Sequence, residues 1–454
     1  MNLEVVILAA GKGTRMRSAL PKVLHAVAGK ALLAHVIDTA QTLKPQKTHV
    51  VYGFGGEVVP TTLASAPVQW VLQAEQKGTG HAVQQAMPQI GADAVVLILY
   101  GDVPLTRRDT LAPLVEIATA GHLALLTMEL ADAAGYGRIV RDAHGRVAQI
   151  VEHKDASPAQ RDIREINTGI IAVGAKHLWR WLAALKNNNA QGEYYLTDIV
   201  AMAVADGVKI ETRHPTYTWE IMGVNSKQQL AELERIEQAN RAQALMEQGV
   251  TLLDPTRIDV RGTLVCGQDV VIDVNCVFEG DVVLGDRVRI GANNVIRNAR
   301  IGSDSIVQPQ CVIEDARIGD AARIGPFARI RPDTELAAHV HIGNFVEIKK
   351  SQIGEGSKVN HLSYIGDSSI GSKTNIGAGV ITCNYDGANK HRTVIGNDVF
   401  VGSDCQLVAP VTIGDGATIG AGTTVTRDAP ASELTLGRVK QKSITGWKRP
   451  TKKQ

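Results

Sequence analysis

Along the tract from about Leu284 to Val425, aliphatic side chains keep returning six residues apart, in triplets that start seventeen residues apart. In its clearest part, Leu284, Ile290 and Ile296 form one triplet. A six-residue period fits neither an α-helix nor an alternating strand, but it is typical of a parallel β-solenoid, in which each hexapeptide supplies one short strand and one corner. We expect the aliphatic residues to point into a narrow prism, with Gly, Ala, Asn and Asp at corners that need positive φ or close backbone approach. The period alone leaves open whether this solenoid is an inert spine, a trimerisation module or part of an enzyme.

The first half of the chain alternates apolar strands with helical patterns. Continuous apolar runs at Val5–Ala10, His49–Tyr52 and Val95–Tyr100 are typical of strands buried on both faces of a parallel sheet. Helical patterns at Leu32–Leu43 and Thr79–Met87 lie between these runs. This βα alternation predicts a doubly wound, Rossmann-like α/β domain, in which ligands gather at the carboxyl ends of the strands.

The segment Ser226–Gln248 connects the two patterns and contains neither Gly nor Pro. Ser226 followed by Gln229 fits a capping box, and Gly249 fits a helix stop. Because apolar and charged residues are mixed along this segment, we expect a long, mostly exposed helix that separates two domains. The predicted boundaries are 1–227 for the α/β domain, 228–248 for a helical linker, and 249–454 for the solenoid domain with a basic C-terminal arm.

Composition and charge narrow the classes of protein that fit this organisation. The chain has 454 residues, of which 44% are apolar and 21% charged, and its formal net charge of +2 argues against general nucleic-acid binding. The start MNLEVVILAAGKG lacks the basic first residues and long apolar run of a signal peptide, and no stretch approaches the roughly 18 apolar residues of a membrane span. Five cysteines without CxxC spacing indicate reduced thiols rather than a disulfide framework or a zinc site. We therefore expect a soluble, cytoplasmic protein without a membrane partner.

Two polar loops follow predicted strands of the first domain. In the loop Gly11–Arg15, backbone N–H groups could approach phosphate oxygens, and Lys12 and Arg15 supply positive charge. It is not the dinucleotide GxGxxG, because its last position is Met16, and it is not a P-loop, because no GK[ST] follows at the right distance. The second loop, Tyr100–Asp102, places a carboxylate where it could hold Mg²⁺ beside a triphosphate. Taken singly, each loop is also compatible with a simple turn.

The hexapeptide period is interrupted twice by residues that a solenoid does not require. KVNHLSYIGD contains His361 and Tyr364, and ITCNYDGANKHRT delays the next aliphatic position until Ile395. An insertion in a solenoid falls on one face, which is often the binding face. Histidine is the usual general base near neutral pH, although a lone histidine at a corner is more often structural than catalytic. The interruptions therefore predict chemistry on one face of the solenoid.

A series of motifs runs through the first domain in a fixed order: LAAGKGTRM, PKVLH, QAEQKGTGHA, YGDVPL, GYGRI, VEHKDA, INTGI, NNNAQGEYYLTD and GVN. In order and spacing they resemble the sugar-1-phosphate nucleotidyltransferases. With the solenoid included, the whole chain resembles the family of bacterial bifunctional N-acetylglucosamine-1-phosphate uridylyltransferases/glucosamine-1-phosphate acetyltransferases. The joint order of the motifs is highly specific, although no single motif is.

The resemblance implies a uridylyl-transfer site in the first domain. Arg15 and Lys22 would neutralise charge while the sugar phosphate attacks the α-phosphorus of UTP, a reaction that needs alignment more than a protein nucleophile. Asp102 and Asn225 would be the Mg²⁺ ligands. The residues implied in binding are Leu8, Ala9, Ala10, Gly11, Lys22, Tyr100, Gly101, Asp102 and Asn225 for UTP or the UDP-sugar, Gln73, Gly78 and Thr79 for the uracil and its neighbouring groups, and Gly137, Glu152 and Asn167 for the sugar.

The resemblance also implies an acetyl-transfer site on the solenoid. His361 would accept a proton from the amine of glucosamine-1-phosphate as that amine attacks the thioester of acetyl-CoA. We expect direct transfer rather than an acetyl-cysteine on Cys383, because no other feature marks that thiol as activated. The residues implied in binding are Arg331, Lys349 and Lys390 for the sugar phosphate, Tyr364, Asn375, Asn384 and Tyr385 for the sugar or acetyl group, and Ala378, Ser403, Ala421 and Arg438 for the acetyl-CoA groove.

Further expectations concern assembly and product. By resemblance, the solenoid winds left-handed and forms a homotrimer with acetyl sites at solenoid interfaces, and the product, UDP-N-acetylglucosamine, supplies peptidoglycan and lipopolysaccharide synthesis. The basic arm Arg438–Gln454 would lie near coenzyme A or a neighbouring subunit, unless it is only a flexible tail. Two rival interpretations are a nucleotidyltransferase with a single activity and a structural or regulatory solenoid, and a scaffold derived from a degenerate transferase.

Overall fold

The chain folds into two compact units, and the boundary between them lies between Glu237 and Gln238. The computed structural model describes residues 2–450 and 452, so the ends of the predicted first domain and of the basic arm, at residues 1, 451, 453 and 454, lie outside the described residues. Within the described part of the chain, no helix is both long enough and apolar enough to cross a bilayer. The five cysteines are free thiols.

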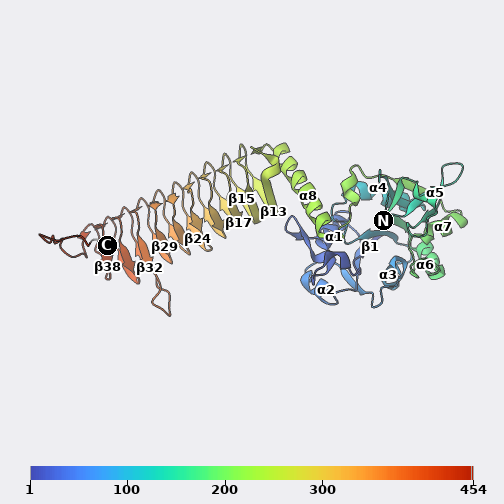
Figure 1. Cartoon of the computed structure of the whole chain (residues 1–454), viewed down its shortest axis with the longest axis horizontal. Coiled ribbons are helices and arrows are strands. Elements are labelled where there is room, and N and C mark those ends of the chain that lie inside the picture. Colours follow the sequence, from blue (N-terminus) through green and yellow to red (C-terminus); the bar gives the residue numbers. More distant parts are fainter. Residues whose placement is uncertain (1, 451, 453–454) are drawn as a thin grey trace. The chain divides into compact units, whose positions relative to one another are not determined.

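The first unit is built on one twisted sheet (Figure 1). Its strands lie in the order β11-β7-β10-β6-β1-β4-β5, with the β8–β9 hairpin beside β10. β1 pairs parallel with β4 and β6, as the apolar runs predict, whereas β10 runs antiparallel between β6 and β7. The bounds are β1 Leu3–Leu8, β4 Lys47–Tyr52, β5 Gln69–Leu72, β6 Val95–Tyr100, β7 Leu123–Glu129, β8 Arg138–Arg141, β9 Val147–Val151, β10 Glu165–Gly174 and β11 Ile210–Arg213, with a separate small hairpin formed by β2 Ala26–Val27 and β3 Lys30–Ala31.

Helices cover both faces of this sheet, as a doubly wound fold requires. Alternate residues of β1 belong to different cores: Val6 packs with α3, α6 and α7, whereas Val5 and Ile7 pack with α1 and α4. The bounds are α1 Leu32–Thr42, α2 Val58–Thr62, α3 Thr79–Ala86, α4 Arg108–Thr119, α5 Pro158–Arg161, α6 Ala175–Ala184 and α7 Asp198–Ala205. The predicted Rossmann-like fold of this domain is therefore confirmed.

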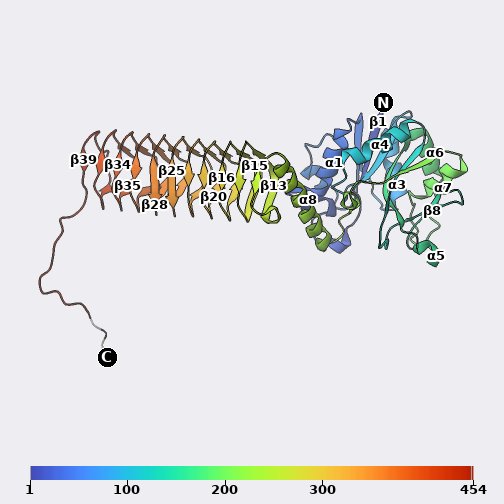
Figure 2. The ribbon, with the colours of Figure 1, turned by 90° about the horizontal axis from the view of Figure 1, so that it is seen from above.

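The second unit is a parallel solenoid whose coils stack one on the next (Figures 1 and 2). One ladder of parallel strands runs from β12 (Thr251–Leu252) to β39 (Leu434–Thr435), and two interleaved ladders run between β13 (Ile258–Cys266) and β38 (Thr424–Val425). These ladders are the three faces of each coil. The aliphatic residues of the repeat fill one continuous core inside them, so the predicted hexapeptide solenoid is confirmed. Its left-handed winding stays a prediction.

Glycines beside the aliphatic residues let the backbones of successive coils approach each other closely. A Cβ on Gly285 would lie 2.6 Å from the backbone nitrogen of Ser303 in the next coil. The left-handed corner positions hold the expected Asn293, but also Phe327 and Phe345, whose rings stack with centroids 5.1 Å apart. The corner composition was therefore predicted only in part.

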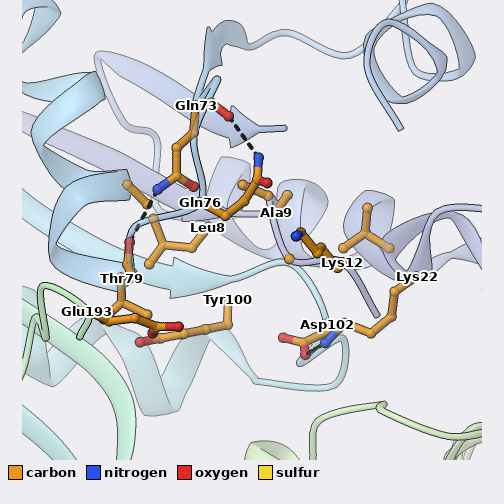
Figure 3. Close-up of a pocket in the computed structure, with 15 residues that line it drawn as sticks. Leu8, Ala9, Lys12, Lys22, Gln73, Gln76, Thr79, Tyr100, Asp102 and Glu193 are labelled. Atoms are coloured by element: carbon orange, nitrogen blue, oxygen red, sulfur yellow. Dashed lines mark hydrogen bonds and ion pairs between the residues drawn. The ribbon is translucent and has the colours of Figure 1, made fainter. Parts of the chain in front are cut away.

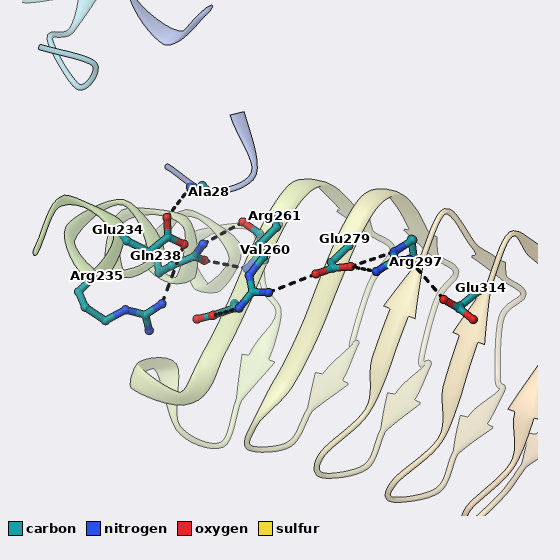
Figure 4. Close-up of polar contacts among 10 residues, drawn as sticks. Ala28, Glu234, Arg235, Gln238, Val260, Arg261, Glu279, Arg297 and Glu314 are labelled. Carbon is teal, nitrogen blue, oxygen red and sulfur yellow. Dashed lines mark hydrogen bonds and ion pairs between the residues drawn. The ribbon is translucent and has the colours of Figure 1, made fainter. Parts of the chain in front are cut away.

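Helix α8 (Lys227–Glu247) contains the boundary between the two units. Its first half packs on the first unit, where Leu233 is fully buried, and its second half packs on the solenoid, where Leu245 joins the core. Gln238 exchanges two hydrogen bonds with the backbone of Val260, at 3.0 and 2.7 Å (Figure 4). The buried residues of this helix are Leu233, Gln238, Ala242 and Leu245, and its other residues are exposed or partly exposed, which fits the expected mostly exposed helix. The linker limits 228–248 stay a prediction.

Candidate active sites

The first candidate site is a cavity of about 380 Å³ at the carboxyl ends of β1, β5 and β6 (Figure 3). Parallel strands end at the same edge of a sheet, which is why loops from distant parts of the sequence meet there. Gly101, at the turn after β6, lies directly behind the lining and donates its N–H to the Leu8 carbonyl at 2.9 Å. The lining residues are Leu8, Ala9, Ala10, Gly11, Lys12, Lys22, Val23, Gln73, Gln76, Gly78, Thr79, Ala82, Tyr100, Asp102 and Glu193.

Two oxygen ligands in this site share one cation. The Lys22 ammonium forms an ion pair with Asp102 and donates to Oδ1 of Asn225 at 3.1 Å. The side chains of Lys22 and Asp102 are only 12% and 16% exposed, so their ion pair is largely shielded from solvent. Among the described residues, no group of three or more His, Cys, Asp or Glu could hold a metal ion. One carboxylate and one amide oxygen that converge on a cation nevertheless fit a hard divalent metal that takes its other ligands from phosphate and water.

The Gly-rich loop after β1 supports Lys22 directly. Gly13 has φ 57, and a Cβ there would lie 2.7 Å from Cβ of Lys22, so only glycine lets the loop approach this side chain. Lys12 lines the cavity, whereas Arg15 is exposed on the 3₁₀ turn Thr14–Met16 and does not line it.

The three residues predicted to bind the sugar also come together, beside the cavity rather than in its lining. The Asn167 N–H donates to the Gly137 carbonyl at 2.8 Å, and a Cβ on Gly137 would lie 3.4 Å from Oε1 of Glu152. Oε1 of Glu152 accepts a hydrogen bond from the Thr197 hydroxyl at 3.0 Å. Burial raises the pKa of Glu152; the Thr197 hydrogen bond opposes this rise, and the charge of Asp155 adds to it.

Tyr100 connects the two groups of residues. Its ring packs against Gly169, where a Cβ would lie 2.5 Å from the ring, so this position excludes larger residues. Burial raises the pKa of Tyr100, and the nearby charges of Glu152 and Asp102 add to the effect. The tyrosine therefore stays a neutral phenol near Glu152 and Asp102.

Some lining residues were not predicted from the sequence. Gln76 donates to the Gln73 carbonyl at 3.1 Å, and Glu193 stands beside Gly78 at the cavity wall. Both lie inside motifs that carry the resemblance, so position within a motif was the available signal. The residues in this group are Val23, Gln76, Ala82 and Glu193.

The second candidate site lies on the solenoid, beyond a column of paired charges. Figure 4 shows this column from Arg261 to Glu314. Along one solenoid face, Arg261, Glu279, Arg297 and Glu314 occupy the same position in successive coils and form consecutive ion pairs. The register then brings Arg331, which forms an ion pair with Glu347 at 2.7 Å, and, one coil later in the same column, Lys349. Alternation therefore fails where the predicted phosphate-binding residues begin.

Beyond that point, cations gather around one carboxylate. Lys349 lies 3.7 Å from Asp367, which also accepts a hydrogen bond from Asn384. The neighbouring Lys390 ammonium lowers the pKa of Lys349, burial adds to the effect, and Asp367 opposes it. Asn384 also lies 3.4 Å from the Tyr364 hydroxyl. Because the positive charges of Lys349 and Lys390 repel each other, a bound anion would stabilise the pair.

The loop after β32 (Ile381–Cys383) supplies the remaining members of this group. The Lys390 ammonium lies 5.7 Å from the centre of the Tyr385 ring. Asp386 accepts hydrogen bonds from two backbone N–H groups of the loop and from His391, and these contacts lower the pKa of Asp386. The loop is therefore internally braced. Burial raises the pKa of Cys383, which argues against an activated thiolate.

His361 lies in a different column of stacked residues from Lys349. In the preceding coil this column holds Asn344. Nδ1 of His361 lies 3.1 Å from Oδ1 of Asn344. In later coils the corner carries Ala378, Ser403 and Ala421, whose carbonyl accepts a hydrogen bond from the Arg438 guanidinium. Small residues there leave room for an extended ligand along the corner.

The described contacts therefore keep the predicted acetyl-site residues in separate groups within one chain. One group surrounds Lys349 and Asn384, and the other follows the His361 corner. Asn375 starts β31 (Asn375–Ile376) on a third position, in register with Lys358 and Phe400. No hydrogen bond or ion pair between described residues joins the first two groups.

Comparisons with known proteins cover the whole chain. Residues 5–252 match the MobA-like NTP transferase domain, residues 264–298 and 392–427 match the bacterial transferase hexapeptide (six repeats), and residues 318–407 match the GMPPB C-terminal domain. The chain is 66% identical to the bifunctional protein GlmU of Thiobacillus denitrificans, over 99% of this chain and 98% of the relative. It is 62% identical to the GlmU protein of Nitrosospira multiformis over 99% and 98%, and 61% identical to that of Azoarcus sp. over the full length of both.

Proposed function

Because the chain belongs to the family of the bifunctional protein GlmU, we propose that it carries two transferase activities, one in each compact unit. The solenoid unit acetylates glucosamine-1-phosphate with acetyl-CoA. The first unit then joins N-acetylglucosamine-1-phosphate to UMP from UTP, giving UDP-N-acetylglucosamine and pyrophosphate. The observation that carries the proposal is the convergence of Lys22, Asp102 and Asn225 at a nucleotide-sized cavity.

In the first unit we assign Mg²⁺ to Asp102 and Asn225. The fit rests on their shared interaction with the Lys22 ammonium, which marks a place where both oxygens face a cation. When bound, Mg²⁺ would neutralise and align the triphosphate. Lys22 would then turn to phosphate oxygens, and the backbone N–H groups of the Gly11 loop would bind further ones.

Uridylyl transfer needs an aligned nucleophile. A phosphate oxygen of the sugar phosphate attacks the α-phosphorus of UTP, the bond to the β-phosphate oxygen breaks, and pyrophosphate leaves. Glu152, Asn167 and the backbone at Gly137 would hold the sugar, and Tyr100 would separate it from the metal ligands. Arg15, exposed in the absence of substrate, would approach the triphosphate from the Gly-rich loop. Alignment of this kind can supply a large part of the rate enhancement.

Acetyl transfer uses the solenoid residues. Lys349, Lys390 and Arg331 would hold the sugar phosphate, and His361 would accept the proton that the amine loses as its nitrogen attacks the thioester carbonyl. The carbon–sulfur bond then breaks and coenzyme A leaves. Because these residues lie in separate groups in one chain, we propose a homotrimer in which neighbouring solenoids bring them together. The arm from Arg438 onward would lie near the anionic end of coenzyme A.

We propose that both reactions take place in the cytoplasm. All five cysteines are free, and burial holds the pKa of Cys276 at about 11 and that of Cys266 at about 12. Thiols of this kind persist unpaired in a reducing compartment, where UTP and acetyl-CoA are also made.

A reciprocal pair of substitutions tests the proposal. Asp102→Ala should lower Mg²⁺-dependent release of pyrophosphate from UTP and N-acetylglucosamine-1-phosphate by at least about 10³-fold, because it removes a metal ligand, while acetyl transfer stays within twofold. His361→Ala should lower acetyl transfer by about 10²–10³-fold, the usual contribution of a general base, and leave pyrophosphate release unchanged. Full acetyl transfer by His361→Ala would favour a single-activity nucleotidyltransferase. Absence of both activities in the unaltered chain would favour a scaffold.

A further inference from the structure

The side-chain amide of Gln73 is fixed in one orientation at the end of the cavity. Its Nε2 donates to the Gly78 carbonyl at 3.2 Å and lies 3.0 Å from Nδ1 of His81 (Figure 3 shows the first of these contacts). Gln73 is 2% exposed, so the amide has little freedom to turn. An amide nitrogen carries two hydrogens, and both are used here. The atom left for a ligand in the cavity is therefore Oε1, a pure acceptor.

The tautomer of His81 determines whether this arrangement holds. Nδ1 can accept from Gln73 only if it carries no proton, which places the single ring proton of the neutral imidazole on Nε2. Nε2 lies 3.2 Å from the side-chain nitrogen of Gln85, which also donates to the His81 carbonyl at 3.3 Å.

We propose that His81 is a positioning residue that sets the base specificity of the nucleotide site, because it holds Oε1 of Gln73 toward the N3 edge of the base. There an acceptor pairs with the N3–H of uracil, whereas it faces the N3 lone pair of cytosine. The proposal rests on the proposed function, in which UTP fills this cavity with its base beside Gln73. It adds a residue outside the cavity lining that decides which pyrimidine the lining accepts.

The surroundings of His81 keep its ring neutral. Burial lowers the pKa of His81, and the positive charge of Lys77 adds to the effect, whereas Glu75 opposes it. The other neighbouring ring is Tyr194, whose centroid lies 6.5 Å away. When His81 is protonated at low pH, Nδ1 becomes a donor and repels Nε2 of Gln73. The amide cannot turn over without bringing Oε1 against the Gly78 carbonyl, so acid should disturb uracil recognition.

Two substitutions separate the acceptor from the ring. In His81→Asn, Oδ1 takes nearly the same place as Nδ1 and keeps an acceptor for Gln73, whereas His81→Leu fills similar space without one. The measurement is kcat/KM with UTP and with CTP, at saturating N-acetylglucosamine-1-phosphate and Mg²⁺, from pH 5.5 to 8. Acetyl transfer by the same full-length preparations reports whether the chain is folded.

His81→Leu should reduce the UTP-over-CTP ratio by about tenfold, the effect of one hydrogen bond, and His81→Asn should keep it within about threefold of the unaltered chain. The ratio should fall toward pH 5.5 in the unaltered chain and stay flat in His81→Asn. An unchanged ratio in His81→Leu overturns the proposal, and so does an equal loss in both variants, which would assign the effect to packing of the ring. Absence of pyrophosphate release by the unaltered chain contradicts the proposed uridylyl transfer instead, so the two failures are distinct.

Discussion

The pocket of the first unit and the face of the solenoid bring residues together by opposite means. In the pocket, Lys22, Asp102 and Asn225 come from distant parts of the sequence and meet within hydrogen-bonding distance in one chain. On the solenoid, residues one coil apart are stacked in columns, and His361 belongs to a different column from Lys349.

The difference follows from the two architectures. A doubly wound sheet sends every parallel strand toward one edge, so loops that are far apart in sequence converge there. A solenoid gives each coil contacts only with its neighbours, so a column preserves sequence order and cannot fold back on itself. Chemistry that needs residues from two columns must come from an inserted loop, such as the one that carries Lys390, or from another copy of the chain.

The largest expected effect is complementation between inactive solenoids. Chains with Lys349→Met and with His361→Ala, coexpressed with different tags and purified on both tags, should recover about one third of the unaltered acetyl transfer, because a mixed threefold ring keeps one intact interface in three. Each variant alone should be nearly inactive. The measurement is acetyl transfer from acetyl-CoA, followed by thiol release.

The pocket supplies the matched control for this experiment. Lys22→Met and Asp102→Ala lie in one cavity of one chain, so their mixture should recover no uridylyl transfer. If the solenoid variants fail to complement in verified mixed trimers, the acetyl site is contained in a single chain, and the contrast between the two regions is lost.

A smaller effect is expected from Thr197→Val in the pocket. Loss of the hydroxyl that donates to Glu152 should raise KM for N-acetylglucosamine-1-phosphate about tenfold, or about 1.4 kcal/mol, and leave KM for UTP within twofold. That hydroxyl opposes the raised pKa of Glu152. Without it the pKa rises further, fewer carboxylates remain ionised in acid, and the acidic limb of the KM profile should move to higher pH.

Thr197→Ser is the control for this substitution, because it keeps the donor. It should restore both KM and the pH profile. If the serine variant resembles the valine variant, the threonine acts through packing of its methyl group at the start of α7 rather than through Glu152.

The sequence predicts the parts of this molecule that depend on short-range patterns. The period of six is sufficient for the solenoid, because each aliphatic residue is buried by its own coil and the next. Apolar runs are sufficient for β1, β4 and β6, because strands buried on both faces need no other signal. The resemblance then named many of the residues that line the pocket, among them Gln73, Thr79 and Asp102.

Long-range geometry is the part that the sequence does not contain. Nothing near Thr197 in the sequence indicates Glu152 as a partner, because the pair forms only when separate segments fold together. The sequence likewise does not indicate that Leu233 of α8 packs on the core of the first unit whereas Leu245 packs on that of the solenoid.

The smallest expected effect belongs to Arg297, which holds the same column as Arg331. Arg297 is flanked by Glu279 and Glu314 and is exposed to solvent, so Arg297→Met removes a surface ion pair of small value. Acetyl transfer should stay within twofold of the unaltered chain. Arg331→Met, where the alternation of charges ends, should instead raise KM for glucosamine-1-phosphate about tenfold, the effect of losing one charged hydrogen bond. Equal effects of the two substitutions would mean that the column acts through its overall charge, and that the position at which alternation fails has no special part in binding the sugar phosphate.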